Sequence, residues 1–375
     1  MSQIEIKVKN INADYSIILG NNVLNILPKK IKKLCPKTEK IAIILDKNVP
    51  KKYKFILKKL LKKYDLYFFE YKTNEKTKSF INVNKLVEKC LAVNFKRSDI
   101  VLGLGGGIIG DFAAFSASLI KRGVNFINIP TSLLAQVDSS IGGKTGVNSK
   151  YGKNLIGSFY NPRLVISDIS FLKSLPRREM ICGYAEILKH SLINDEKFFN
   201  WLKINSKNII YQKKINLIKT AIQRSCKIKL FFVNKDFKEK NIRMMLNFGH
   251  TFGHAIEAKS NFSRKINHGE AVLVGMIMAT KLSYMSKICS KKTLTDLTSI
   301  YKNSGLSNYT NIKKFFKKSE YSAIINFMTN DKKNNDEKIN LILLKKIGKT
   351  TYPGQYKFST EDLRKKIKKL SNFNF

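Results

Sequence analysis

The first half of the chain alternates short apolar runs with longer segments of helical periodicity. The apolar runs lie at residues 41–45, 66–71, 100–104, 126–129 and 164–166. The helical segments between them lie near 50–63, 79–95 and 109–120. Two alternating runs that precede them, at 4–8 and 15–19, predict an opening hairpin. This alternation is typical of βαβ units, so it predicts an α/β fold around a largely parallel sheet.

The second half of the chain has a different pattern. Strand-like runs nearly vanish after residue 176, and apolar residues recur at helical spacing over 178–194, 213–232, 247–260 and 269–288. A chain of 375 residues exceeds the roughly 250–300 residues at which one hydrophobic core stops growing. We therefore predict an α/β domain over 1–175 followed by an all-α domain over 176–375.

The formal net charge of +43 raises the hypothesis of nucleic-acid binding. The lysines that produce it are spread from Lys7 to Lys369, whereas a nucleic-acid footprint is clustered. Lysine also accompanies abundant Asn, Ile and Phe, which share A/T-rich codons, so genomic bias is the favoured explanation. We expect no nucleic-acid partner, although the positive field would attract anionic substrates.

Neither the cysteines nor the apolar segments indicate secretion or a membrane. The five cysteines are far apart and odd in number, which predicts neither a disulfide framework nor a thiolate metal site. The first residues lack an apolar run like a signal peptide, and no segment reaches about 18 apolar residues. We expect a cytoplasmic protein with no membrane partner.

A glycine-rich turn follows the apolar run 100–104 and opens a helical segment. Backbone N–H groups at such a turn approach a pyrophosphate closely, and the helix dipole favours the anion. Asp46 and Asn48 follow the run 41–45 and would lie at the same carboxyl edge of the sheet. A tight turn without a ligand is the alternative interpretation of the glycines, and a turn with a helix cap is that of Asp46 and Asn48. The glycines are Gly103, Gly105, Gly106, Gly107 and Gly110.

The segment 130–162 is rich in glycine and hydroxyl residues and shows little periodicity, so we expect a long loop. Loops of this length inside a compact domain are usually functional. Lys144, Lys153 and Asn154, with Arg122 upstream, offer donors of the kind that clamp a phosphate or carboxylate.

Three of the four histidines, His250, His254 and His268, fall within one short stretch. His250 and His254 are spaced i, i+4, so they share one helix face, and Glu186 could complete a site with an open position for substrate. Three N/O ligands without a thiolate suit Zn²⁺ or Co²⁺. Spacing alone leaves two ligand pairs open, namely His250 with His254, or His250 with His268 while His254 relays protons.

Six motifs occur together in one order along the chain. They are G-G-G-x-x-G-D, Q-V-D-S-S-x-G-G-K-T, G-K-N-x-I-G, A-E-x-x-K, L-N-x-G-H-T-x-G-H-A-I-E and H-G-E-A-V. With these motifs the sequence resembles the 3-dehydroquinate synthase family of the sugar phosphate cyclase group. The resemblance covers nearly the whole chain and implies a Rossmann-like NAD domain followed by a helical metal domain, assembled as a homodimer.

The resemblance also implies a reaction. A lyase of this family converts 3-deoxy-D-arabino-heptulosonate 7-phosphate, a sugar-acid phosphate, into 3-dehydroquinate and phosphate. The steps are transient oxidation by NAD, phosphate β-elimination, re-reduction and an intramolecular aldol addition. This reaction belongs to the shikimate pathway, which leads to chorismate and the aromatic amino acids.

Site residues follow from the resemblance position by position. The implied metal ligands are Glu186, His250 and His268, with His254 close by as a proton relay. The implied NAD contacts are Asp46, Asn48, Glu75, Lys78, Gly106, Gly107, Asp111, Thr131, Ser132, Asp138, Lys144, Lys153, Phe171, Ser174 and Leu175. The implied substrate contacts are Arg122, Asp138, Lys144, Lys153, Asn154, Lys189, Lys229, Arg243 and Asn247. Of these, Lys144, Lys189, Arg243 and Asn247 are expected to act in catalysis with His254, and Arg122 to reach the partner subunit's site.

Three segments depart from the family pattern without removing a predicted ligand. D-G-E-x-x-K reads Thr-Asn-Glu-Lys-Thr-Lys over 73–78, a Thr-Thr pair reads Thr131-Ser132, and D-E-x-E-x-G-x-R ends in Asn241-Ile-Arg243. Asn74 and Asn241 stand where the family has glycine. Asparagine is the residue next most tolerant of left-handed backbone, so we expect these departures to weaken NAD affinity at most, without loss of activity.

Two rival enzymes share these features in part, a related sugar phosphate cyclase and a metal-dependent polyol dehydrogenase of the same broad fold. The A-E-x-x-K and G-G-K-T segments favour a cyclase, because a plain dehydrogenase needs no clamp for a phosphate leaving group. A binding protein is supported by the net charge alone.

Overall fold

The computed structural model describes residues 3–9, 14–260, 265–312, 315, 320–329 and 338–371. The chain forms two compact units, Met1–Glu179 and Met180–Phe375, which we call the N-terminal and C-terminal units. The division between them falls near the start of helix α5 (Arg177–Asn194).

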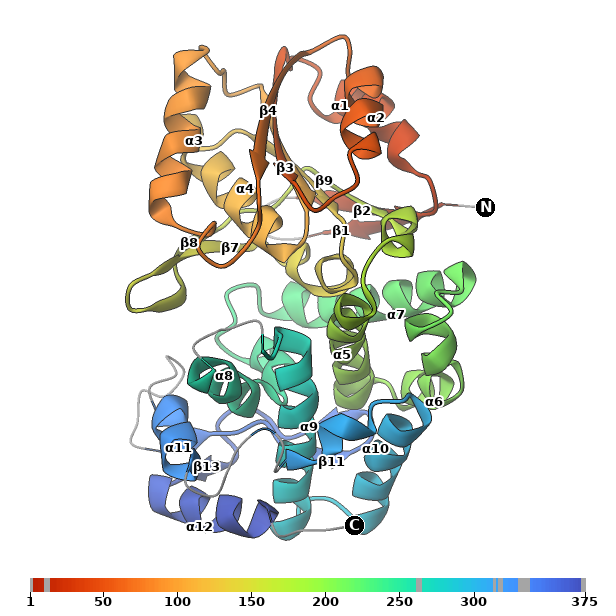
Figure 1. Ribbon diagram of the computed structural model, residues 1–375, viewed down its shortest axis with the longest axis vertical. Helices are drawn as coiled ribbons and strands as arrows, with labels where there is room; N and C mark the ends of the chain where they lie inside the picture. Colours follow the sequence, from red (N-terminus) through yellow and green to blue (C-terminus); the bar gives the residue numbers. More distant parts are fainter. Residues whose placement is uncertain are drawn as a thin grey trace. The chain divides into compact units, whose positions relative to one another are not determined.

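A seven-stranded sheet forms the centre of the N-terminal unit, with strand order β1-β2-β9-β6-β5-β3-β4 (Figure 1). Every neighbouring pair is parallel except β1 and β2, which form the predicted antiparallel hairpin. The predicted α/β fold with a largely parallel sheet is therefore confirmed. The strands are β1 (Ile4–Val8), β2 (Tyr15–Gly20), β3 (Lys40–Asp46), β4 (Asp65–Tyr71), β5 (Ile100–Gly105), β6 (Asn125–Pro130) and β9 (Leu164–Asp168).

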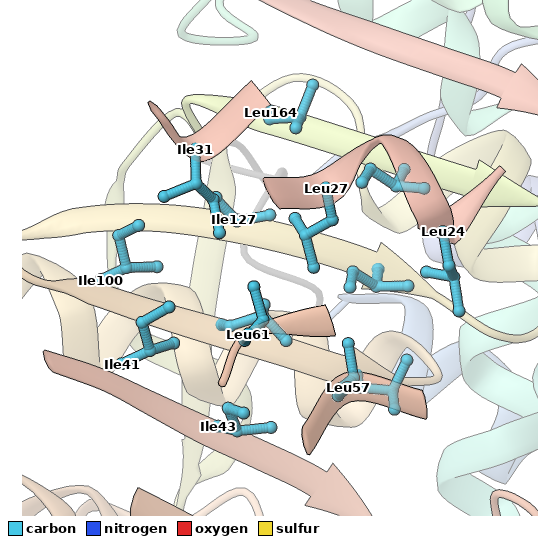
Figure 2. Close-up of a cluster of buried hydrophobic side chains, with 14 of the residues drawn as sticks. Leu24, Leu27, Ile31, Ile41, Ile43, Leu57, Leu61, Ile100, Ile127 and Leu164 are labelled. Carbon is cyan, nitrogen blue, oxygen red and sulfur yellow. The ribbon is translucent and has the colours of Figure 1, made fainter. Parts of the chain in front are cut away.

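Helices cover both faces of this sheet. Figure 2 shows one side of the core, where Ile41 and Ile43 of β3 pack with Leu27 and Leu57. Because successive strand residues point to opposite faces, Ile44 packs into a second core with residues of α3 and α4. Burial on both faces explains why these strands are continuous apolar runs. The helices are α1 (Leu27–Leu34), α2 (Lys52–Leu60), α3 (Phe80–Ala92) and α4 (Gly107–Leu119).

Asp168 joins the end of β9 to the end of β2. Its buried carboxylate accepts hydrogen bonds from the backbone N–H groups of Asn22 at 2.9 Å and Val23 at 2.7 Å. It also accepts the N–H of Ser170 at 2.9 Å. A buried carboxylate with several N–H donors is well satisfied, so this contact holds the chain at the carboxyl edge of the sheet.

The segment 130–162 is not the long loop expected from its sequence. It contains a single helical turn, Ala135–Ser139, and a hairpin of β7 (Lys144–Ser149) and β8 (Gly152–Phe159). Three strand positions are glycines, namely Gly146, Gly152 and Gly157, and a Cβ on Gly157 would lie only 2.1 Å from the Thr145 carbonyl oxygen. Glycines and polar residues where apolar residues would alternate conceal the strand period, so the loop expectation was wrong.

The C-terminal unit is mainly helical, as predicted. Helix α9 is buried around most of its circumference, and α8, α10 and α12 pack against it. Its helices after α5 are α6 (Glu196–Ile210), α7 (Ile215–Lys235), α8 (His250–Lys259), α9 (His268–Met285), α10 (Lys291–Asn303), α11 (Tyr321–Thr329) and α12 (Thr360–Ser371). The short strands are β10 (Ile339–Asn340), β11 (Leu344–Lys346), β12 (Lys349–Thr350) and β13 (Lys357–Phe358). Among the described helices, none combines the length and the apolar character that a membrane span requires.

Candidate active site

Most residues that the sequence assigned to NAD follow the carboxyl ends of the parallel strands. Asp46 ends β3, and Glu75 and Lys78 follow β4. Gly106, Gly107 and Asp111 follow β5, while Thr131, Ser132 and Asp138 follow β6. Strands β4 and β5 lie on opposite sides of β3, so the chain reverses direction across the sheet between β3 and β5. Dinucleotides bind in open α/β sheets at such a reversal.

The glycine turn lies at this reversal. A Cβ on Gly105 would come within 2.7 Å of Ile109 and 3.1 Å of the Asp46 Cβ, so only glycine fits. The next residue, Gly106, has extended backbone at the N-cap of α4. No side chain within the described chain caps this helix start, which leaves its N–H groups to an anion.

Asp46 anchors a small polar network beside the glycine turn. Its carboxylate accepts hydrogen bonds from the Asn48 side chain at 2.9 Å and from the Thr73 hydroxyl at 2.7 Å. Thr73 stands where the family pattern has aspartate, and here its hydroxyl donates the hydrogen bond to Asp46. The Asn74 side chain accepts N–H bonds from Lys76 and Thr77, so Asn74 stabilises the turn by its side chain. Asn74 is not among the residues with positive φ, so its backbone lies outside the left-handed region.

The β7–β8 hairpin is joined to this edge by one ion pair, from Lys153, and one hydrogen bond, from Lys78 to Asn154. Lys153 contacts Glu75 at 2.9 Å, and Lys78 contacts Asp111 at 2.6 Å and the Asn154 side-chain oxygen at 2.5 Å. Burial alone would raise the pKa of Glu75, but the Lys153 ammonium and a hydrogen bond from Asn148 lower it. These five predicted residues therefore form one network.

Other predicted residues of this unit lie outside the network. Phe171 is 3% exposed, and its ring packs against that of Tyr53 at an interplanar angle of 40° within the hydrophobic core. Ser174 is exposed, Leu175 is half-buried, and Lys144 is exposed at the start of the hairpin. Arg122 follows α4 and precedes β6, so it lies at the opposite edge of the sheet from the glycine turn.

The predicted metal ligands come from three helices of the C-terminal unit. Glu186 lies on α5, His250 is the first residue of α8, and His268 is the first residue of α9. One ligand atom from each lies within 4.8 Å of the others. The Glu186 Oε1 atom is 3.5 Å from His250 Nε2 and 3.8 Å from His268 Nε2.

The chemistry of this donor set fits a divalent cation. Glu186 is fully buried, and its Oε2 atom pairs with the Lys189 ammonium. Its Oε1 atom has no hydrogen-bond partner among the described residues, although both Nε2 atoms lie near it. A buried carboxylate oxygen requires a partner, and a metal ion at this point would supply it. His254 belongs instead to a second group, with Glu257 and His268.

Glycines allow the three helices to approach closely. A Cβ on Gly269, next to His268, would lie 2.4 Å from the Cys182 Cα atom on α5. A Cβ on Gly275 of α9 would lie 2.0 Å from the carbonyl oxygen of Gly249, which precedes His250. Gly249 itself has φ +79°, a left-handed conformation that favours glycine. These contacts place the N-termini of α8 and α9 against α5.

The remaining predicted substrate residues lie on α7 and in the turn that precedes α8. Lys229 is buried on α7, while Arg243 and Asn247 lie in a 3₁₀ turn, Ile242–Asn247. Arg243 donates to the Phe237 carbonyl oxygen at 2.5 Å, and the Asn247 side chain donates to Glu239 at 2.8 Å.

Asp236 shapes that turn by accepting three backbone N–H groups, including those of Asn241 and Arg243. Asn241 has φ −137°, so its backbone also lies outside the left-handed region. The left-handed residue is Glu239, with φ +55°. Asp236, Glu239 and Glu257 had no assigned role in the sequence, although all three lie within its motifs.

Comparison with known proteins agrees with this arrangement. The model of the 3-dehydroquinate synthase N-terminal family matches residues 68–182, and that of the C-terminal family matches residues 183–334. The 3-dehydroquinate synthase of Pelagibacter ubique is 48% identical over 97% of this chain and 98% of its own length. The chain belongs to the 3-dehydroquinate synthase family.

Solved structures with the same fold include other cyclases. A 2-deoxy-scyllo-inosose synthase complexed with carbaglucose-6-phosphate, NAD⁺ and Co²⁺ has a TM-score of 0.86 and 26% identity, over 98% of this chain and 100% of that chain. A 2-epi-5-epi-valiolone synthase from Streptomyces hygroscopicus has a TM-score of 0.83 and 23% identity, over 96% of this chain and 97% of that chain. The fold predicted for this 3-dehydroquinate synthase family member, a Rossmann-like unit followed by a helical unit, is confirmed.

The glycine contact between α8 and α9 generates a prediction for this family member. Gly275→Ala places a Cβ against backbone, so we expect a loss of about 3 kcal/mol in the free energy of unfolding. Metal affinity should fall on the order of 10-fold or more, because His250 moves with Gly249. Denaturant unfolding and Co²⁺ titration measure the two effects.

The matched control for this experiment is Gly253→Ala in the same helix pair. There the new Cβ would lie 3.3 Å from Ala271 backbone, which requires a shift of only a few tenths of an ångström. We expect this variant to remain close to the unmodified protein. Equal behaviour of the two variants would contradict the role given to the close approach at Gly275.

Proposed function

We propose that the chain converts 3-deoxy-D-arabino-heptulosonate 7-phosphate into 3-dehydroquinate and phosphate. The observation that carries this proposal is the cluster of Glu186, His250 and His268, within a chain of this family. The proposed NAD-binding domain covers residues 1–175, and the proposed metal- and substrate-binding domain covers 176–375.

The proposed cofactors are NAD and one divalent ion, Zn²⁺ or Co²⁺, and a related cyclase is known with NAD⁺ and Co²⁺. When bound, NAD accepts and returns a hydride and the metal polarises a substrate hydroxyl. The glycine turn and the Asp46 network would hold the dinucleotide, with the other proposed contacts around them: Asn48, Glu75, Lys78, Gly106, Gly107, Asp111, Thr131, Ser132, Asp138, Lys144, Lys153, Phe171, Ser174 and Leu175. Glu186, His250 and His268 would hold the metal.

The chain's own side chains would bind the anionic substrate and move protons. The carboxylate and phosphate of the substrate need fixed cations, which the proposed substrate residues supply. Lys189 would also hold the Glu186 side chain in place by pairing with its second oxygen. His254, half-buried with its ring centroid 5.4 Å from that of His250, would relay the proton of the substrate hydroxyl. The proposed substrate residues are Arg122, Asp138, Lys144, Lys153, Asn154, Lys189, Lys229, Arg243 and Asn247.

The direct test is incubation of the purified protein with NAD, Co²⁺ or Zn²⁺ and 3-deoxy-D-arabino-heptulosonate 7-phosphate. We expect metal-dependent release of phosphate and 3-dehydroquinate in equal amounts without net NADH, because the hydride is returned. His250→Ala should abolish both products by removing a proposed ligand. Accumulating NADH would indicate a dehydrogenase instead. If neither product forms although the protein binds NAD, the substrate is that of another cyclase.

A cytoplasmic location is also part of the proposal. All five cysteines are buried, and none forms a disulfide within the described chain, which suits a reducing compartment. Subcellular fractionation tests this location, and recovery of the protein outside the cytoplasmic fraction would contradict it.

We further propose a homodimer that forms through an exposed apolar face of the N-terminal unit. The hairpin β7–β8 packs beside α3 and α4 (Figure 1), and a hydrogen bond of 3.0 Å joins Ser158 to Ser118. This hairpin face consists of Phe80, Ile81, Leu119, Leu155, Ile156 and Phe159, all at least 36% exposed. Exposed apolar side chains on the hairpin and on the two helices beside it favour a protein partner, and exposed Arg122 lies three residues beyond Leu119.

Sedimentation equilibrium tests the homodimer. We expect twice the chain mass of 43.0 kDa for the unmodified protein. Ile81→Asp should shift the equilibrium toward the monomer, since a charge would enter an apolar interface. Ile204→Asp is the control, because Ile204 is 80% exposed on α6 and lies outside the hairpin face. A monomeric unmodified protein, or equal effects of both variants, would contradict the proposed interface.

A further inference from the structure

Glu257 lies on the same face of α8 as His250 and His254, at the i+7 position from His250. Its side chain is buried, with 8% of the residue exposed. Its Oε2 atom lies 3.0 Å from the Nδ1 atom of His268, across the gap between α8 and α9. A buried carboxylate in this position requires a donor, and the imidazole N–H supplies one.

This contact determines which nitrogen of His268 carries the proton. An ionised carboxylate only accepts hydrogen bonds, so Nδ1 must carry the hydrogen that it donates to Glu257. The Nε2 atom of the neutral ring then carries a lone pair, and it faces Glu186 Oε1 at 3.8 Å. A metal ligand needs this unprotonated nitrogen.

His250 has a weaker counterpart of the same contact. Its Nδ1 atom lies 3.3 Å from the backbone carbonyl oxygen of Phe248, while its Nε2 atom faces Glu186 Oε1 at 3.5 Å. Both histidines therefore direct Nε2 toward one oxygen atom. The two histidines differ in the acceptor of the Nδ1 hydrogen, which is a carboxylate for His268 and a backbone carbonyl for His250. A charged acceptor forms a stronger hydrogen bond than a neutral one.

We propose that Glu257 is a positioning residue that orients His268 for the metal. The proposal rests on the function proposed above, because it takes the metal to bind at Glu186, His250 and His268. The second cluster, His254 with Glu257 and His268, offers the competing possibility that Glu257 is itself a ligand. The 3.0 Å contact favours positioning, because the carboxylate already holds the Nδ1 hydrogen.

The test compares Glu257→Gln and Glu257→Ala with the unmodified full-length protein. Co²⁺ and Zn²⁺ affinities are measured by titration of the metal-free protein, and ligand geometry by the visible absorption of the Co²⁺ form. Thermal unfolding of the metal-free protein monitors the fold. Asp296→Asn is the control. This variant also removes a carboxylate from a half-buried ion pair, in which Asp296 Oδ1 lies 3.1 Å from Lys203 Nζ, and neither residue is a proposed ligand.

We expect metal affinity to fall on the order of 10-fold in Glu257→Gln and nearer 100-fold in Glu257→Ala. The amide oxygen of Gln still accepts the Nδ1 hydrogen but lacks the charge, which explains the order. The Co²⁺ spectrum of Glu257→Gln should keep its shape, since the three ligands remain. Asp296→Asn should bind metal as the unmodified protein does.

Two results would overturn the proposal. Unchanged metal affinity in both Glu257 variants would show that His268 needs no positioning carboxylate. A changed Co²⁺ spectrum in Glu257→Gln, or complete loss of its metal binding, would make Glu257 a ligand. Failure of the unmodified protein to bind any metal would instead remove the proposed function, so the two failures are distinguishable.

Discussion

The close approach of helix α9 to α5 and α8 is the contact on which the C-terminal unit depends. Backbone meets backbone at Gly269 and Cys182, and again at Gly275 and Gly249. A side chain at either glycine of α9 would push the helices apart and shift the proposed ligands relative to one another. The proposed metal site is thus a consequence of helix packing, and no single helix contains it.

In the N-terminal unit, a different physical cause brings the proposed site residues together. There the parallel sheet brings the ends of β3, β4, β5 and β6 to one edge, whatever residues follow them. Side-chain contacts then hold the following segments, with Asp46 bonded to Thr73 and Lys78 bonded to Asp111. The sheet determines where the proposed dinucleotide contacts lie, and the polar network determines how they are oriented.

Elements whose apolar residues follow a strand pattern or a helix period could be predicted from the sequence. The strands of the central sheet and helices α5, α7, α8 and α9 are of this kind. The hairpin over 144–159 was missed, since glycines at 146 and 157 replace the expected apolar alternation. Spacing alone could not separate the two histidine pairs, because the contact between α8 and α9 decides which imidazoles converge. Glu257 carried no signal of its own for the same reason.

The central claim is that Glu186, His250 and His268 bind one divalent ion. Anomalous diffraction at the cobalt edge, from crystals of the Co²⁺-loaded protein, tests it most directly. We predict one peak per chain at about 2.0–2.2 Å from Glu186 Oε1 and from the Nε2 atoms of both histidines. A peak instead among His254, Glu257 and His268, or no ordered cobalt at either cluster, would contradict the claim.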